Sequence, residues 1–359
     1  MRRLIYIFII GLLLCSYTWA DGSRYASKSL LSEGKWVKIR VDKTGIYKLS
    51  YADLKNMGFS DPSKVSVHGY GGWPLDEDFS KEYIDDVPST PVWRGSDYLL
   101  FYGKGPVKWE YDSSSQTFVH TNNPYSLYGY YFVTDATPTN DMTSVAQASG
   151  ASTRITTYDD YLLHEQELVS VNQSGREFFG EDFSGARPRT ISTFSSIPGI
   201  TDADGKVTMR FISRINSGSG TASLSINDSE LLDITIPSVQ TVSSNVRSYT
   251  KAIPGTTTAL WKGSKSEKNN VVVSYSSSGH TNVRLDYIRM QFVRTLRPYG
   301  ACTFFRSLTS VGNSSRFVIS EANSNTLVFD VTDALNVKRV EMPAKAPRVM
   351  ELSGRNVPS

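Results

Sequence analysis

Two β-rich regions of the sequence are joined by the stretch Asn172-Gln173-Ser174-Gly175-Arg176-Glu177-Phe178-Phe179-Gly180-Glu181-Asp182-Phe183. It mixes two glycines, three phenylalanines and four charges, a pattern that fits neither a regular helix nor an alternating strand. Its glycines can adopt positive φ, so the backbone can turn while the aromatic rings pack on either side. We therefore predict a packed junction, the alternative being an ordinary loop with anchored aromatics. In it, Arg176 and Glu177 or Glu181 tie the two regions together. Phe178 and Phe179 fill the space between the two regions.

The first region begins with a hairpin and one short helix. Residues 36–41 alternate apolar and basic side chains, and a turn ending at Gly45 leads into the apolar run 46–49. Ser50 and Asp53 then have capping-box-like spacing, and Gly58 is placed to end the helix in a left-handed conformation. The remaining strands of this region are predicted over residues 65–68, 98–102, 107–111 and 129–134. We place this N-terminal β domain at residues 25–150.

The second region has the spacing of a β-sandwich. Short apolar runs separated by Gly, Ser or Asn clusters are typical of a sandwich of jelly-roll type. These runs cover residues 207–214, 222–226, 231–236, 271–275, 283–293, 303–305, 317–319 and 327–329. We place the sandwich at residues 184–335. The fold class is thus mainly β, with two β domains, the second a jelly-roll-like sandwich, and one short helix after the first hairpin.

Two segments connect these domains to each other and to the C-terminus. Residues 151–183 form the connector and packed junction, and the part over 155–171 fits a short helix or an extended arm equally well. Residues 336–359 contain three prolines and are predicted to be an unpacked linker or a strand without its partner.

Composition limits the classes of partner. Residues 1–20 combine Arg2, Arg3, an apolar run and a small residue at the expected cut, which indicates a secretory signal peptide. Its removal lowers the formal charge from +3 to +1 because both arginines leave with it. No basic field is then available for nucleic acid, and no later apolar run is long enough to span a membrane. Only Cys302 remains, which excludes an intrachain disulfide.

Cys302 is also the one candidate nucleophile of the mature chain. A cysteine peptidase needs a thiolate beside a histidine, and no histidine is close to Cys302 in sequence. His68, His120, His164 or His280 could approach it only through the fold. Because the surrounding run alternates like a strand, we predict that Cys302 is a small apolar residue packed in a sheet.

Candidate metal motifs fail on spacing. His164-Glu165-Gln166-Glu167-Leu168 begins like a zinc-protease pattern, but leucine stands where the second histidine is needed. Asp202-Ala203-Asp204-Gly205 has two acids spaced as in a calcium loop without the further ligands, so a turn between strands is favoured. The acids at 76–78 fit a solvated face. We predict no metal and no cofactor, since a phosphate-binding glycine loop is also missing.

Aromatic side chains offer a different possibility, a platform on which sugars stack. Stacking needs flat, exposed rings with polar neighbours, whereas core and rim packing is the commoner use of these residues. The candidates are Tyr70, Trp73, Trp93, Trp109, Tyr125, Tyr128 and Trp261. We expect packing for most of them.

Four motifs resemble one known family. They are, in chain order, Gly45-Ile46-Tyr47-Lys48-Leu49 with the following Leu54-Lys55-Asn56-Met57-Gly58, Asp97-Tyr98-Leu99-Leu100-Phe101-Tyr102-Gly103-Lys104-Gly105, Ser174-Gly175-Arg176-Glu177-Phe178-Phe179-Gly180-Glu181, and Leu285-Asp286-Tyr287-Ile288. Their sequence and order resemble the region before the catalytic domain of gingipain-type cysteine peptidases, the family that includes the sortases of the type IX secretion system. The resemblance runs from about residue 33 to the C-terminus.

The resemblance implies a function and also what is missing. Complete enzymes of this family remove C-terminal sorting signals from type IX secretion cargo and help attach it to surface lipopolysaccharide. Their catalytic Cys and His lie downstream of the matched region, so we assign no catalytic, cofactor-binding or metal-binding residue to this chain. Residues 336–359 are then expected to lead toward a missing catalytic domain.

Partners and location follow from the same resemblance. It implies contacts with the missing peptidase domain, with outer-membrane components of the type IX system and with cargo proteins. The chain is expected to pass through the periplasm to the outer-membrane surface or the extracellular space, and not to be transmembrane after signal cleavage. The alternative function is a self-standing β-sandwich module that binds glycan or protein at the cell surface.

Overall fold

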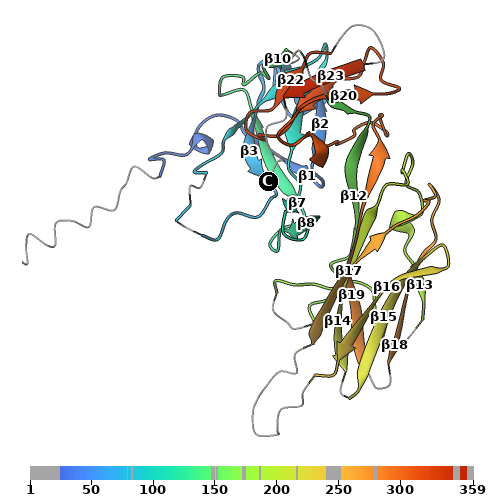
Figure 1. The fold of residues 1–359 in the computed structure, drawn as a ribbon. Coiled ribbons are helices and arrows are strands. Elements are labelled where there is room, and N and C mark those ends of the chain that lie inside the picture. Colours follow the sequence, from blue (N-terminus) through green and yellow to red (C-terminus); the bar gives the residue numbers. More distant parts are fainter. Residues whose placement is uncertain are drawn as a thin grey trace, which may run out of the picture.

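The structure is a computed structural model of the full chain. It describes residues 25–78, 80–81, 84–146, 150, 153–171, 175–185, 187–215, 217–239, 252–277, 281–342 and 348–353. The predicted signal peptide at 1–20 lies outside the described residues. The chain forms an upper lobe, which combines its N-terminal and C-terminal strands, and a lower lobe (Figure 1).

The N-terminal strands form two small sheets and a hairpin. The sheets have the strand orders β1(Val37–Val41)-β9(Gly129–Thr134)-β3(Ser66–Gly71)-β4(Ser89–Thr90) and β2(Gly45–Ser50)-β6(Tyr98–Gly103)-β5(Val92–Arg94), and β7(Val107–Asp112) pairs with β8(Thr117–Asn122). Their inner faces share a core that includes Val67, Leu99, Phe101 and Val133, each fully buried. Burial on this scale stabilises a sheet pair, because each apolar side chain removed from water contributes about 1.5–3 kcal/mol.

The single α-helix lies where the capping pattern predicts it. Helix α2(Tyr51–Asn56) begins after Ser50, whose side chain accepts a hydrogen bond from the Asp53 N–H. Gly58 follows with φ of +87°, a conformation that costs glycine little. Leu54 is fully buried and holds the helix against the first core. The mainly β fold class is confirmed, with this helix as its one α-helical element among the described residues.

The lower lobe is an antiparallel sandwich. One sheet has the order β12(Thr157–Glu165)-β19(Thr281–Thr295)-β14(Gly205–Ile215)-β17(Ile253–Trp261), and the other β13(Arg189–Thr190)-β18(Val271–Ser277)-β15(Ser219–Ile226)-β16(Ser229–Pro237). Buried residues alternate along β15, as expected for a strand with one face in the core. The enclosed core includes Met209, Phe211, Leu224, Val273 and Ile288.

The segment 155–171, which fitted a helix or an arm equally well, is extended. β11(Thr153–Ile155) and β12 are strands, and β12 pairs with β19 over nine residues, from Thr157 opposite Thr295 to Glu165 opposite Tyr287. The pairing explains the choice: an isolated short helix is marginal, whereas the strand gains a complete ladder and buries Tyr158.

The C-terminal strands pair with the end of the N-terminal region and with the connector, and not with the sandwich. β20(Ser314–Ile319) lies between β11 and β23(Arg348–Ser353), and β22(Lys338–Val340) lies between β10(Ser144–Val145) and β21(Val328–Asp330). The predicted runs near 317–319 and 327–329 are therefore strands outside the sandwich sheets, and 303–305 is not a strand. The tail was predicted to be unpacked or unpartnered; it instead contributes β22 and β23. A small third core around Ile155, Phe317 and Val340 holds these strands together.

The junction is packed as predicted, with Phe179 buried, but Phe183 and not Phe178 is the second buried ring. Phe179 and Phe183 are each 1% exposed, whereas Phe178 is only half-buried. Gly175 has φ of +74° as expected, but Gly180 is needed for a close approach: a Cβ there would lie 3.1 Å from the Gln166 carbonyl oxygen. Phe183 packs edge-on against Phe211 of the sandwich core, with ring centroids 5.2 Å apart.

Candidate functional site

The candidate site is a cavity of about 510 Å³ on the side of the sandwich where its two edge strands β12 and β13 end. The junction closes it from one side. Its lining includes the charged or titratable residues His164, Glu181, Asp182, Arg189 and Arg284. Three stretches of chain thus supply the polar groups: the end of β12, the stretch from the junction to β13, and β19.

His164 is held from both sides of its ring. Its Nε2 is 2.7 Å from Glu181 Oε1, and its Nδ1 is 2.8 Å from Thr193 Oγ1. Burial is the largest influence on the pKa of Glu181 and would raise it, but the hydrogen bond from His164, a backbone hydrogen bond and the charges of His164 and Arg189 together lower the pKa below its usual value. Because both ring nitrogens are engaged, His164 acts as a link between β12 and the junction, which agrees with the failed zinc motif.

Two arginines complete the polar lining. Arg284 donates to the Gly180 carbonyl at 3.0 Å and lies 3.4 Å from Asp182 Oδ2. Arg189 donates to the Asp182 carbonyl at 2.8 Å. Glu181 Oε2 and Arg284 Nε are buried without a hydrogen-bond partner among the described residues. Both atoms belong to residues that line the cavity, but they are shielded from solvent, so its lining contains a buried acceptor and a buried donor without partners in the described part of the chain.

Other junction charges reach both β regions, as predicted. Arg176 pairs with Glu77 of the N-terminal region at 2.6 Å, and Glu177 pairs with Arg210 of β14 at 3.2 Å. Arg210 also pairs with Asp286, which is 4% exposed. Burial raises the pKa of Asp286 to about 6, although Arg210 opposes this shift. The prediction that Arg176 and Glu177 tie the two regions together is confirmed.

The hairpin β7–β8 fixes the upper lobe to the outer face of the β12–β19 sheet. Trp109 stacks on Tyr161 with ring centroids 3.8 Å apart. The backbone N–H of Phe118 donates to Gln291 Oε1 at 2.9 Å. His120 Nε2 lies 3.2 Å from Glu165 Oε2, with both side chains nearly buried. This seam is aromatic and hydrogen-bonded, so it positions the lobes through specific contacts.

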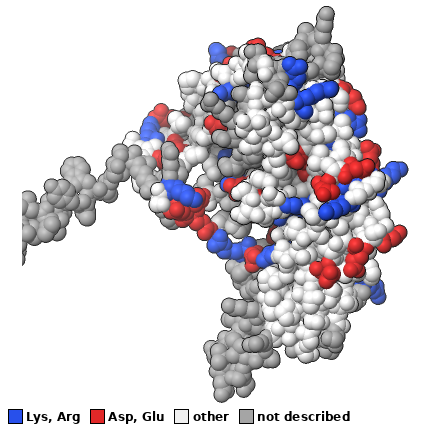
Figure 2. All heavy atoms as spheres, viewed as in Figure 1, with Lys and Arg blue, Asp and Glu red and all other residues white. Residues whose placement is uncertain are grey.

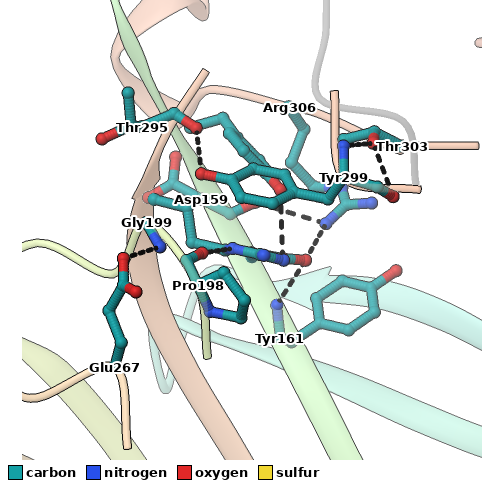
Figure 3. A network of polar contacts seen from close by, with 12 residues as sticks. Asp159, Tyr161, Pro198, Gly199, Glu267, Thr295, Tyr299, Thr303 and Arg306 are labelled. Atoms are coloured by element: carbon teal, nitrogen blue, oxygen red, sulfur yellow. Dashed lines mark hydrogen bonds and ion pairs between the residues drawn. The ribbon is translucent and has the colours of Figure 1, made fainter. Parts of the chain in front are cut away.

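A second polar network lies at the other end of β12 (Figure 3). Asp159 accepts from the Leu308 N–H at 2.7 Å, and Arg306 donates to the Asp159 carbonyl at 3.3 Å. Arg294 donates to Asp160 at 2.8 Å and packs over the Tyr299 ring at 3.6 Å. These contacts hold the segment after β19 against the sandwich, which fixes the start of the C-terminal strands.

The stability of the protein should depend on pH through Glu167. Burial, and then the charge of Glu165, raise the pKa of Glu167 to about 7 from an unperturbed 4.5. Its contribution to stability is therefore complete below about pH 4.5 and is lost as the pH rises through 7. We expect Glu167→Gln to gain stability relative to the wild type across this window, measured by urea unfolding at pH 4.5, 6 and 7.5. Glu230→Gln on β16 is the control. The prediction is contradicted if the difference in the free energy of unfolding between Glu167→Gln and the wild type does not change with pH.

The histidines and Cys302 do not form a nucleophile pair among the described residues. Cys302 is exposed and lies outside any strand, which corrects its predicted place in a sheet. The reason is the turn after β19, which the alternation of its sequence does not reveal. His68 is buried against Thr137, and burial lowers its pKa. His120 is in the seam and His164 in the cavity lining; His280 lies outside the described residues.

Metal and membrane features are limited. Asp202 accepts a hydrogen bond from the Lys265 N–H at 2.8 Å, as a turn-capping acid does. Within the described ranges, no group of three or more His, Cys, Asp or Glu side chains is arranged to hold a metal ion. None of the helices among those residues is long and apolar enough to cross a membrane.

The candidate aromatics are spread over several sites. Trp109 is in the seam, Trp261 is 7% exposed, and Tyr70 and Trp73 enclose Lys104, whose pKa burial lowers to about 8. Tyr125 is 80% exposed. The described rings therefore do not form one sugar-stacking platform.

Charged side chains of both signs are interspersed on the face shown in Figure 2, which agrees with the near-neutral balance of the sequence.

Comparison with solved structures gives one strong match. Dimeric latent PorU from Porphyromonas gingivalis is similar with a TM-score of 0.78 and 33% sequence identity, over 91% of this chain and 31% of the PorU chain. The fold of this chain is PorU-like. The chain spans 31% of the length of that relative, so two thirds of the PorU chain has no counterpart here.

Other comparisons add little. A CBM35 module from Cellvibrio japonicus matches with a TM-score of 0.23 and 16% identity, over 38% of this chain and 97% of the module. The CBM22-1 and GH10 modules of a Clostridium thermocellum xylanase match with a TM-score of 0.21 and 12% identity, over 44% of this chain and 28% of theirs. Such scores carry no argument. No protein-family model matches the sequence, and neither does any curated protein.

The residues that sequence reasoning missed are Thr193, Arg189 and Arg284. Arg189 and Arg284 line the cavity, and Thr193 holds His164 beside it; long-range strand pairing brings these parts together, as where Asp182 bridges to Arg284. No local spacing indicates such a meeting. His164 and Glu181 were noticed in sequence, but for a zinc pattern and for the junction.

Proposed function

We propose that this chain is the non-catalytic N-terminal region of an exported, sortase-like, gingipain-type cysteine peptidase. The observation that carries the proposal is the similarity to PorU over 91% of this chain at 33% identity, with 31% of the PorU chain covered. In full-length form such an enzyme removes C-terminal sorting signals from type IX secretion cargo and aids surface attachment. Its place is the outer-membrane surface or the extracellular space.

The fold is consistent with a role for this region as a rigid platform for another domain. The four family motifs fall on β2 with α2, on β6, on the junction and on β19, the elements that build and join the two lobes. The junction and the seam together cross-link the lobes through ion pairs and stacked rings. A rigid platform of this kind suits docking, since the cost of ordering has been met before a partner arrives.

The partner that the proposal requires is a peptidase domain carrying the Cys and His. A covalent link raises the effective concentration of such a partner to about millimolar for short linkers, so even a modest interface would be occupied. Contacts with type IX outer-membrane components and with cargo belong to the same proposal. They would be made by the assembled protein.

Titration of this chain with the peptidase domain from the same organism tests the proposal. We expect heat of binding by calorimetry, or a change in cleavage of labelled peptides with Arg, Lys or neutral residues at the cut site. This chain alone should cleave none of them, with or without Cys302→Ala. Docking would be contradicted if neither heat nor any effect on cleavage were seen up to about 100 μM. That concentration as a Kd corresponds to a binding free energy of about −5.5 kcal/mol.

The second candidate is a self-standing binding module at the cell surface. The cavity at the junction favours it, because its volume and polar lining are characteristic of a ligand site. Loss of the docking signal together with ligand binding by this chain would support the module.

A further inference from the structure

The cavity beside β12 and β13 has the properties of a ligand-binding site. At about 510 Å³ it falls within the range of ligand sites, and its polar lining is drawn from three segments. Leu168 stands at this lining with 59% of its surface exposed. Leu168 thus gives the polar lining one apolar surface that is open to a ligand.

The charged lining and the strand edge beside it define what a ligand must carry. Charges within the lining are balanced, since Glu181 and Asp182 are matched by Arg284 and Arg189. Of the two arginines Arg189 is the exposed one, with one N–H donated to the Asp182 carbonyl, so its guanidinium has further donors to offer. A peptide group supplies both a donor and an acceptor, and a carboxylate suits the arginine fork.

The wall of the cavity also offers a strand edge. β13 ends its sheet and pairs on one side with β18. The Ile191 N–H donates to the Val271 carbonyl at 2.8 Å, so the alternation of an antiparallel ladder turns the N–H and C=O of Thr190 away from β18. Thr190 lines the cavity. An unpaired edge of this kind is a template for another strand.

These observations separate a peptide from a sugar as the ligand. Sugars bind protein surfaces with flat aromatic rings, and no Phe, Tyr or Trp is among the described residues that line this cavity. Backbone groups at a strand edge, by contrast, match the repeat of an extended chain.

We propose that this cavity binds an extended peptide that adds to the edge of β13 and places a carboxylate on Arg189. Leu168 covers an apolar side chain of the same peptide, and the outward N–H and C=O of Thr190 pair with the peptide backbone. The proposal concerns this chain by itself and does not depend on a peptidase partner.

Fluorescence anisotropy of the full chain with two labelled, C-terminally amidated hexapeptides tests the proposal. The probes are Thr-Val-Thr-Val-Thr-Glu and Thr-Val-Thr-Val-Thr-Gln, in 150 mM salt. We expect the Glu peptide to bind with Kd below about 100 μM, and the Gln peptide to bind about tenfold more weakly because the charge-assisted contact is lost. Arg189→Gln should remove this preference, whereas the neighbouring Arg187→Gln should leave it unchanged.

Thr190→Pro tests the strand edge separately. It deletes the outward N–H and leaves the ladder to β18 intact, so it should weaken both peptides by a similar factor. Thermal melting of each variant establishes that it is folded; if Thr190→Pro does not fold, Arg189→Gln decides the matter. Absence of saturable binding up to about 1 mM, equal binding by wild type and Arg189→Gln, or displacement of the peptide by xylohexaose would overturn the proposal.

Discussion

Replacing Phe179 by alanine is expected to lower the free energy of unfolding by about 3–5 kcal/mol, the range for truncating a buried aromatic side chain. Phe179 is 1% exposed and packs with Ile212, Ala252 and Val171. Its backbone N–H also donates to the Val169 carbonyl at 2.8 Å, so the ring cannot move away without loss of the junction. The Arg210 guanidinium lies 6.0 Å from the ring centroid. The measurement is urea unfolding followed by circular dichroism.

Phe178→Ala is the matched control, because it removes the same ring from the adjacent, half-buried position. Its cost should be near the average for point mutations, about 1 kcal/mol. Equal losses for the two variants would show that the junction is held by its backbone or its charges. A loss below about 0.5 kcal/mol for Phe179→Ala, typical of surface sites, would mean that the segment behaves as an exposed loop.

Sequence reasoning succeeded where the signal was local. The Ser50 cap and Gly58 lie within one turn of helix α2, and the short apolar runs mark strands through their own alternation. The junction was recognised from its unusual mixture of residue types. Its anchors were partly misassigned, because the residue pattern does not tell which of Phe178 and Phe183 faces the core once the chain turns at Gly180.

Pairing over long distances could not be read from the sequence. β20 looks like any other short strand, but it pairs with β11, more than 150 residues earlier, and with β23. Strand pattern encodes which face is buried and not which strand is the neighbour. The cavity has the same limitation, since Arg284 and Arg189 meet Asp182 only after β19 and β18 are in place.

Arg210→Met should be the other strongly destabilising change, because it leaves Asp286 buried without its cation. Breaking a buried ion pair from one side costs about 3–5 kcal/mol, much of it the penalty of the remaining charge. Asp286 is 4% exposed, and Glu177 and Glu165 add further negative charge around it. Methionine keeps much of the arginine stem's packing volume, so the measured loss reports chiefly on the charge.

The loss should depend on pH in a defined direction. Burial already raises the pKa of Asp286 to about 6 with Arg210 present, and removal of the arginine raises it further. At pH 5 Asp286 in the variant is then largely protonated and neutral, so the cost of Arg210→Met should be smaller there than at pH 8. Urea unfolding of wild type and variant at both pH values measures the difference.

The double variant Arg210→Met with Asp286→Leu separates charge from packing. With both charges removed, a well-packed apolar pair is often neutral or stabilising, so most of the loss at pH 8 should be recovered. Arg176→Gln, which breaks the exposed pair with Glu77, should cost less than about 1 kcal/mol at either pH. If Arg210→Met stays within about 0.5 kcal/mol of wild type at pH 8, the ion pair does not hold the junction, and packing of Phe179 alone must account for its stability.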